Sequence, residues 1–357
     1  MMLRRRTLSL LSLLSLSALA ACGSEDTSST RGDDNEGGDQ ADTGTTDTGG
    51  EDVITLDTGS GDTGSADTGG SDTGSDDTGT IDIDEPDFAY GAPDEPAAYS
   101  GGACPTLDEG DNDIDSDGAA RTIKLFLPAE PSGAPVLFMW HGLGDSADNF
   151  ASSLGAQQLA EQEGAIVVVP SMGTAATLLG QPIWSFPNAL SQVSEPDLTL
   201  FDDVLSCLDE QFDIDNRRVY SAGFSAGALF TSYLTIERAG YLAATVIWSG
   251  GTSGQLTFRY ASSDYPLPVY LSHGGSSDVF SGVLRFDQMV EDMSAGLAAD
   301  DHFTVLCTHT QGHTVTENIV LGGYDFLFRH QWGTGTSPLA DDGLPRSYAS
   351  TCEVVTP

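Results

Sequence analysis

Basic residues are scarce in this sequence of 357 residues, which holds 13 lysines and arginines against 54 aspartates and glutamates and has a formal net charge of -41. The excess is concentrated: residues 25–117 carry 28 acidic residues and one basic residue, whereas residues 118–357 carry 26 acidic and 9 basic residues. Because an acidic surface repels phosphate, we expect no nucleic-acid partner and no charge-driven binding to anionic lipid.

Large apolar residues are nearly absent from residues 22–100, which consist mainly of Asp, Thr, Gly and Ser. The triplet Asp-Thr-Gly recurs there at a fixed spacing, starting at Asp57, Asp62, Asp67, Asp72 and Asp77. Such a segment buries too little apolar surface to offset the entropy of ordering, and its like charges extend it. The composition therefore predicts a disordered stalk. Aspartic proteases use the same triplet in their active site, but within an apolar strand and turn that this repeat lacks.

A short apolar run, Leu8–Ala18, follows the positively charged start Met1–Arg6. The run is too short to span a bilayer as a helix and ends in small residues, so residues 1–21 are predicted to be an export signal. Small residues directly before Cys22 are typical of bacterial lipoprotein signals, in which that cysteine is lipidated. A plain signal peptide with a chance cysteine is the alternative. No aspartate follows Cys22, which by resemblance to such lipoproteins favours the outer membrane or the cell surface.

Cysteines are few, and four remain after Cys22. In an exported chain, four cysteines suggest two disulfides, with three possible pairings. We favour one bridge that ties the two ends of the folded domain and a second bridge inside it, namely Cys104–Cys352 and Cys207–Cys307.

The segment Asp111–Gly118 places acidic residues at alternate positions before a glycine, a pattern that resembles an EF-hand calcium loop. With Asp113 as the first ligand, however, Lys124 occupies the position of the bidentate glutamate, and no helices flank the segment. We therefore favour an acidic turn before the first strand and assign no metal site.

From about Arg121 the sequence alternates between predicted strands and helices. Several strands are continuous apolar, β-branched runs, as expected for parallel strands buried on both faces. The predicted strands are Thr122–Leu127, Pro135–Trp140, Ala165–Val169, Arg218–Ala222, Ala244–Ser249, Val269–Ser272 and Phe303–Cys307. The predicted helices are Ala147–Glu163, Leu198–Gln211, Ala226–Arg238, Val283–Ala299 and Thr316–His330. This alternation predicts an α/β domain over residues 101–357, with an open, mostly parallel sheet flanked by helices.

The pentapeptide Gly223–Gly227 reads Gly-Phe-Ser-Ala-Gly and lies between a predicted strand and a predicted helix. A sharp strand-to-helix turn strains the backbone of Ser225, and the small residues around it let the neighbouring chain pass. Such a turn projects the serine hydroxyl above the sheet, beside the positive end of the next helix. We therefore predict that Ser225 is a catalytic nucleophile; a glycine-rich turn without function is the alternative.

A serine nucleophile requires a base, and the base requires an orienting acid. In the α/β-hydrolase arrangement both follow the serine in the chain, the acid before the histidine. Asp278 directly follows a predicted strand and is favoured as the acid over Asp264 and Asp287. His313 is favoured as the base over His309, which lies only two residues past its predicted strand.

Two backbone N–H groups are needed to stabilise the oxyanion of the reaction. One should belong to Ala226, the residue after the nucleophile, and the other to Leu143, in the His-Gly loop that follows the strand ending at Trp140. The long connection Met172–Pro196 holds Trp184, which we predict to bind substrate as part of an aromatic wall or lid. Simple packing of this connection onto the domain is the alternative.

These motifs resemble those of the polyhydroxybutyrate depolymerase and feruloyl esterase family. The resemblance covers about Arg121 to Trp332 and rests on the segments Val136–Gly142, Ser146–Phe150, Asp215–Gly227 and Gly312–Val315. The sequence departs from the family at Ala228, where a second glycine is usual, and at Gln311 and Thr316, within a motif that commonly reads Gly-Gly-His-Thr-x-Pro. These departures concern the substrate more than the triad.

The resemblance implies an α/β-hydrolase fold and a serine esterase that forms an acyl-enzyme. The substrates implied are esters of extracellular polymers: polyhydroxyalkanoates, or feruloyl or acetyl groups on plant polysaccharide. We expect no cofactor, and a monomer attached to the membrane through its lipid. Two alternatives stay open. One is a peptidase of the same fold, although no access-restricting extra domain is apparent; the other is a catalytically silent surface-binding protein, which the ordered triad disfavours.

Overall fold

The apolar segments in the middle of the chain form the buried strands of one large sheet. The computed structural model describes residues 88–356 except 179, 188–194 and 254–256. The predicted export signal, Cys22 and the stalk up to residue 87 lie outside the described residues. The sheet has nine strands in the order β1-β2-β4-β3-β7-β8-β9-β12-β13. Their bounds are β1 Gly110–Ser116, β2 Ala119–Phe126, β3 Val136–Trp140, β4 Ile166–Pro170, β7 Val219–Phe224, β8 Ala244–Trp248, β9 Val269–His273, β12 Thr304–Thr308 and β13 Cys352–Val355.

Strands β4, β3, β7, β8, β9 and β12 pair in parallel, and β1, β2 and β13 add antiparallel partners at the two edges. Every residue of β3, β4, β8 and β9 is buried, which explains why these strands read as continuous apolar runs. The prediction of a mostly parallel α/β sheet is confirmed.

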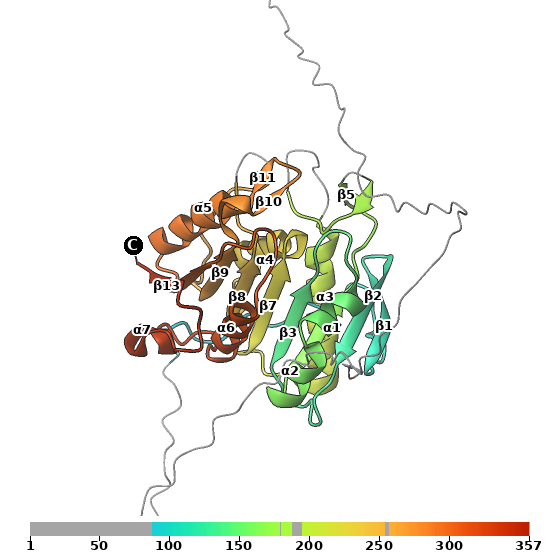
Figure 1. Cartoon of the computed structure of the whole chain (residues 1–357). Helices are drawn as coiled ribbons and strands as arrows, with labels where there is room; N and C mark the ends of the chain where they lie inside the picture. The colour runs from blue at the N-terminus through green and yellow to red at the C-terminus, as the bar shows by residue number, and fades with distance from the viewer. Residues whose placement is uncertain (1–87, 179, 188–194, 254–256, 357) are drawn as a thin grey trace, which may run out of the picture. The chain divides into compact units, whose positions relative to one another are not determined.

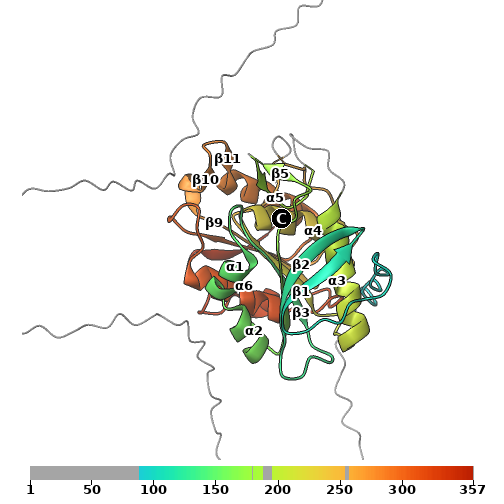
Figure 2. The ribbon, with the colours of Figure 1, turned by 90° about the vertical axis from the view of Figure 1, so that its right-hand side faces the viewer.

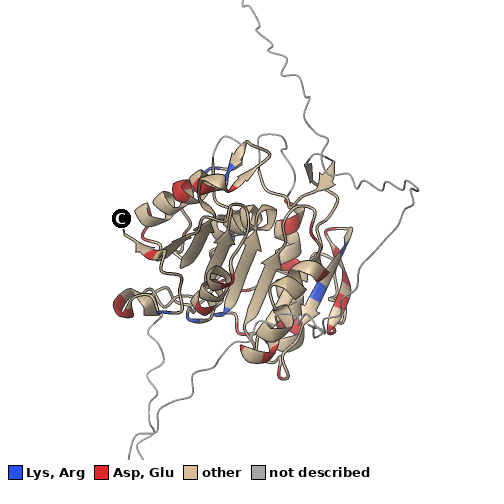
Figure 3. Cartoon of the chain, viewed as in Figure 1, with Lys and Arg blue, Asp and Glu red and all other residues tan. Residues whose placement is uncertain are grey.

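Helices cover both faces of the sheet. Helices α1, α2 and α6 lie on one face, and α3, α4 and α5 lie on the other (Figures 1 and 2). The helix bounds are α1 Ala147–Ser153, α2 Ala156–Gln162, α3 Pro196–Phe212, α4 Ala226–Glu237, α5 Phe286–Ala299, α6 Glu317–Phe328 and α7 Pro338–Asp342. Acidic residues are spread over several of these helices, whereas basic residues are few (Figure 3). Within the described part of the chain, no helix is both long and apolar enough to cross a bilayer.

Two predicted helices have different limits in the structure. The helix predicted over Ala147–Glu163 is divided into α1 and α2 because Gly155 adopts the left-handed conformation, with φ 70° and ψ 38°. The helix predicted from Val283 begins only at Phe286, since the residues before it form a small hairpin of β10 (Val279–Phe280) and β11 (Leu284–Arg285). A second small hairpin joins β5 (Thr177–Leu178) and β6 (Gln181–Pro182).

The four cysteines of the domain form two disulfides, as expected, but both predicted pairings are wrong. Cys104 pairs with Cys207 of α3, and Cys307 pairs with Cys352. The second pairing follows from the antiparallel addition of β13 to β12, which sets Cys352 directly opposite Cys307 in the register. This addition was not predicted, because β13 is a strand of only four residues without a clear apolar run.

The acidic segment Asp111–Gly118 forms β1 and the turn into β2. Asp115 accepts a hydrogen bond from the N–H of Gly118 across that turn, at 2.8 Å. Asp111 forms an ion pair with Lys124 on the neighbouring strand, at 3.0 Å. Most of the segment that was predicted to be an acidic turn is therefore itself a strand, and the turn is limited to Asp117 and Gly118.

Residues 88–100, which the sequence assigned to the stalk, contact the domain. The Phe88 ring lies 3.6 Å from the guanidinium carbon of Arg217. The N–H of Asp94 donates to the carbonyl of Gly240 at 2.9 Å, and the Ser100 hydroxyl donates to Asp203 at 2.7 Å. The folded part of the chain therefore begins before residue 101. Arg217 and Gly240 lie in the loops that lead into β7 and β8, so this segment contacts the domain at the amino ends of the parallel strands.

Candidate active site

The predicted turn at Ser225 is a sharp strand-to-helix junction. Strand β7 ends at Phe224, α4 begins at Ala226, and Ser225 between them has φ 56° and ψ -118°. A Cβ atom at Gly223 would lie 2.3 Å from the carbonyl oxygen of Gly227, and one at Gly227 would lie 1.8 Å from the carbonyl oxygen of Trp140. Glycine is therefore required at both positions by close backbone packing, while Ser225 itself carries the backbone strain.

The structure brings Ser225, His313 and Asp278 into one chain of hydrogen bonds. The Ser225 hydroxyl lies 2.8 Å from Nε2 of His313, and Nδ1 of His313 lies 2.6 Å from Oδ1 of Asp278. The three residues follow β7, β12 and β9, so all three stand at the carboxyl ends of parallel strands. This is the order and geometry of a nucleophile, a base and an orienting acid.

Asp278 is fully buried and has no unpaired oxygen. Its Oδ2 accepts from the Ser249 hydroxyl at 2.7 Å and from the N–H of Gly274 at 2.8 Å, while Oδ1 faces His313. Burial by itself raises the pKa of Asp278, but the hydrogen bonds from His313, Gly274 and Ser249 together outweigh it and lower the pKa below its usual value. Asp278 is thus held as a carboxylate.

The His313 ring lies between two aromatic rings. Phe286 stacks on it with centroids 4.6 Å apart and planes at 12°, and Phe224 stacks on it at 4.9 Å and 29°. These contacts leave the ring little freedom to rotate away from Ser225 and Asp278. The contact with Phe286 was not predictable from the sequence, because it joins the start of α5 to the loop after β12.

The competing residues are placed elsewhere. Asp264 is exposed, and Asp287 forms an ion pair with Arg285 at 2.6 Å. His309 accepts from the N–H of Gln311 at 3.3 Å, and burial lowers its pKa. None of these groups is hydrogen-bonded to Ser225, so the geometry favours Asp278 and His313.

The residues predicted for the oxyanion site lie around the serine. A Cβ atom at Gly142 would lie 3.4 Å from Cβ of Ser225, which brings the His141–Leu143 loop against the nucleophile. Nδ1 of His141 lies 2.9 Å from the carbonyl oxygen of Gly142, and burial lowers the pKa of His141. Leu143 is adjacent in this loop, and Ala226 opens α4. The two predicted N–H donors are therefore within the same small region as Ser225.

Trp184 does not line a substrate site, so this prediction is wrong. Its side chain has no exposed surface, and its ring packs edge-on against Trp140, with centroids 5.0 Å apart. Its indole N–H donates to the carbonyl of His141 at 2.8 Å. The packing alternative holds for this residue: Trp184 packs into the domain and hydrogen-bonds to the loop that begins at His141.

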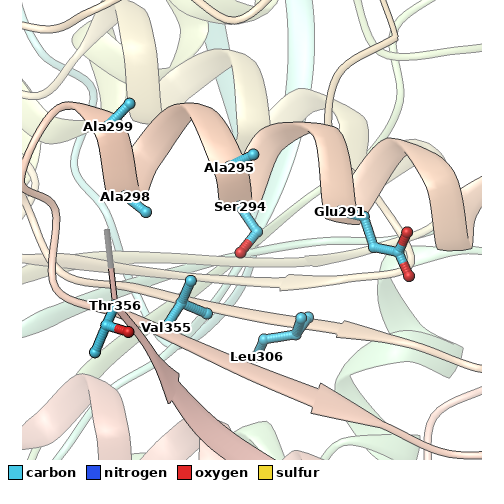
Figure 4. Close-up of a pocket in the computed structure, with 8 residues that line it drawn as sticks. All are labelled: Glu291, Ser294, Ala295, Ala298, Ala299, Leu306, Val355 and Thr356. Carbon is cyan, nitrogen blue, oxygen red and sulfur yellow. The ribbon is translucent and has the colours of Figure 1, made fainter.

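A surface pocket lies away from these three residues. It has a volume of about 520 Å³ and lies between α5 and the β12–β13 edge, lined by Glu291, Ser294, Ala295, Ala298, Ala299, Leu306, Val355 and Thr356. Leu306 and Val355 face the small side chains of α5 there (Figure 4). None of the triad residues lines it.

A parallel sheet that carries a serine, a histidine and an aspartate in this geometry at its carboxyl ends defines an α/β hydrolase. Residues 122–274 match the model of the family described as Esterase PHB depolymerase. Over these residues, which make up less than half of the chain, the sequence is similar to that esterase family.

Two curated relatives are esterases. The chain is 27% identical over 165 residues to a bifunctional acetylxylan esterase/xylanase from Neocallimastix patriciarum, a match that covers 46% of the chain and 22% of that protein. It is 27% identical over 195 residues to feruloyl esterase D from Neurospora crassa, which covers 50% of the chain and 61% of the relative. The chain thus spans less than two thirds of the length of either relative.

Solved structures share the fold. The crystal structure of native pOPH superposes with a TM-score of 0.55 at 18% identity, covering 73% of this chain and 97% of that one. The crystal structure of native sOPH gives a TM-score of 0.55 at 16% identity, with coverages of 71% and 96%. At these identities the likeness concerns the fold alone.

Proposed function

We propose that this protein is a serine esterase in which Ser225 is the nucleophile, His313 the base and Asp278 the acid that orients the base. The observation that carries the proposal is the unbroken chain of hydrogen bonds from Ser225 through His313 to the buried Asp278, at 2.8 and 2.6 Å. The esterase names of the matched family and of both curated relatives support the same reaction.

The reaction proceeds in two halves. The Ser225 oxygen attacks the ester carbonyl carbon while Nε2 of His313 takes the hydroxyl proton, and the N–H groups of Leu143 and Ala226 stabilise the oxyanion. The bond to the alcohol breaks as His313 returns the proton to the departing oxygen, which leaves an acyl-enzyme on Ser225. A water molecule then attacks the acyl carbon, His313 takes its proton and passes it to the Ser225 oxygen, and the free acid leaves.

The substrates are carboxylic esters of extracellular polymers. The matched family points to polyhydroxyalkanoates, and the two relatives point to feruloyl and acetyl esters of plant polysaccharide. The chain acts outside the cytoplasm, attached through a lipid on Cys22 to the outer membrane or cell surface. The positively charged start, the short apolar run and the small residues before Cys22 support this arrangement.

The activity is tested with the full chain on short-chain p-nitrophenyl esters, followed by methyl ferulate, acetylated xylan, hydroxybutyrate oligomers and a peptide ester. We expect turnover of the esters, and a loss of at least about 10⁴-fold in Ser225→Ala. Unchanged turnover in Ser225→Ala contradicts the proposal, and preference for the peptide ester favours a peptidase.

The anchor is tested separately by cell fractionation of the full chain and of Cys22→Ser. We expect the unsubstituted chain in the membrane fraction and the variant in the soluble extracytoplasmic fraction. Equal membrane association of the two proteins contradicts lipidation of Cys22.

A further inference from the structure

Ser249 has an unusual backbone conformation for a buried residue. Six non-glycine residues of the described chain have a positive φ: Asp117, Asp213, Ser225, Ser249, Ser281 and Asp301. Only Ser225 and Ser249 among them are buried, with exposed fractions of 9% and 1%. A positive φ costs about 1–2 kcal/mol for a residue other than glycine, so the fold keeps Ser249 in this conformation at the expense of stability.

The two strained serines end neighbouring strands. Ser225 follows β7 and Ser249 follows β8, and the two strands pair in parallel with Phe224 opposite Trp248. The backbone N–H of Ser249 donates to the carbonyl of Ser272 on β9 at 2.9 Å. Ser249, with φ 56°, is therefore the residue at which the chain leaves the sheet beside the nucleophile. Its backbone also contacts β9, the strand that leads to Asp278.

The Ser249 hydroxyl acts on the catalytic carboxylate directly. It donates to Oδ2 of Asp278 at 2.7 Å, and the N–H of Gly274 donates to the same oxygen at 2.8 Å. Oδ1 is then the oxygen that faces Nδ1 of His313. Two donors on one oxygen fix the rotation of a carboxylate about its terminal bond, which is otherwise soft.

We propose that Ser249 is a positioning residue of the triad, whose hydroxyl locks the Asp278 carboxylate in the rotation that presents Oδ1 to His313. The inference rests on the proposed function, since it assigns Ser249 a role through the acid of that site. Glycine would adopt the same backbone conformation without strain, but it has no hydroxyl group to donate. The strained serine is therefore explained by the hydrogen bond to Asp278.

Two substitutions separate the hydrogen bond from the strain. Ser249→Ala removes the hydroxyl and keeps a Cβ atom at positive φ, whereas Ser249→Gly removes the hydroxyl and relieves the strain. Ser281 provides a matched control, because it is exposed, has φ 51° and lies in the β10–β11 turn. Ser281→Ala and Ser281→Gly make the same chemical changes outside the triad.

The full chain and the four variants are compared by ester turnover and by the rate at which a fluorophosphonate labels Ser225. Both Ser249 variants should lose about 10- to 100-fold in kcat and in labelling rate, as expected for a lost hydrogen bond to a charged group, while KM changes little. The low-field proton resonance of His313 Nδ1–H should shift or broaden in both. The Ser281 variants should match the unsubstituted chain in all three measurements.

Labelling and turnover at the unsubstituted rate in Ser249→Gly overturn the inference, because a chain without the hydroxyl group then positions Asp278 equally well. Labelling of the unsubstituted chain without ester turnover refutes the esterase proposal, yet the labelling rates of the variants still decide the role of Ser249. No labelling of the unsubstituted chain refutes the nucleophile and the role of Ser249 together.

Discussion

At the carboxyl ends of the parallel strands, Ser225 and Ser249 leave the sheet with a strained backbone, whereas the amino ends hold relaxed aromatic packing. There Trp332 packs against Tyr265, with ring centroids 4.5 Å apart and planes tilted by 32°, and donates its indole N–H to the carbonyl of Ala239 at 2.9 Å. Each strained residue costs stability. The two buried residues with this strain therefore lie at the end that carries the triad, whereas the exposed Asp213 and Asp301, which also have positive φ, precede β7 and β12 at the amino ends.

Histidines outside the triad show a related contrast in how their ring nitrogens are paired. The Nε2 atoms of His141, His273 and His309, which end or follow strands at the carboxyl side, are buried without a hydrogen-bond partner among the described residues. His330, near the amino ends, has both ring nitrogens paired, with the carbonyl of Phe326 and the hydroxyl of Ser337, each at 2.7 Å. Unpaired polar atoms in a buried position are unfavourable, and they are often found where a protein carries out its chemistry.

The largest effect should come from replacing one of the two histidines that follow β12, and the two single variants should differ sharply in activity. His313→Ala should lower kcat/KM by about 10⁴-fold, because it removes the base, while His309→Ala should leave most of the activity. Turnover of a p-nitrophenyl ester measures both variants. A greater loss in His309→Ala would show that the base was assigned to the wrong histidine.

The free energy of unfolding should depend on pH through His330, which lies near the amino ends of the strands. Burial lowers the pKa of His330 to about 4, so between that value and about 6.5 the unfolded chain binds a proton that the folded chain does not. Stability should therefore fall as pH falls through this window, by about 2 kcal/mol between about pH 7 and pH 5 from this residue. Urea unfolding of the full chain and of His330→Gln at both pH values measures it.

The variant is expected to have a flatter pH dependence of the free energy of unfolding. An equal slope in the two proteins would mean that His330 contributes nothing and that other buried histidines, such as His302, account for the loss.

The smallest effects should come from two matched tryptophans. Trp184 and Trp332 are both buried, and each donates its indole N–H to a backbone carbonyl. Trp184→Phe should lower kcat by about tenfold, because the loop at His141 loses its support, whereas Trp332→Phe should lower only stability, by about 1 kcal/mol. Enzyme kinetics and thermal unfolding of both variants test this. Equal kinetic effects would remove the distinction between the two ends.

Several features were predictable because they depend on local sequence. Continuous β-branched runs predicted the buried parallel strands, and Gly223–Gly227 between a strand and a helix predicted the sharp turn at Ser225. The order of Asp278 and His313 after the serine identified the residues that the structure places together. The pairing of the cysteines was not predictable in the same way, since it depends on which strand β13 joins.

The sequence by itself determined the kind of sheet, the sharp turn and the identity of the three polar residues, because each depends on periodicity, on residue size or on order along the chain. Only the tertiary structure decided that Trp184 is buried beneath the loop at His141, that Phe286 stacks on His313, and that Ser249 holds Asp278. These contacts join residues far apart in the chain, and their distances depend on how separate strands and helices pack.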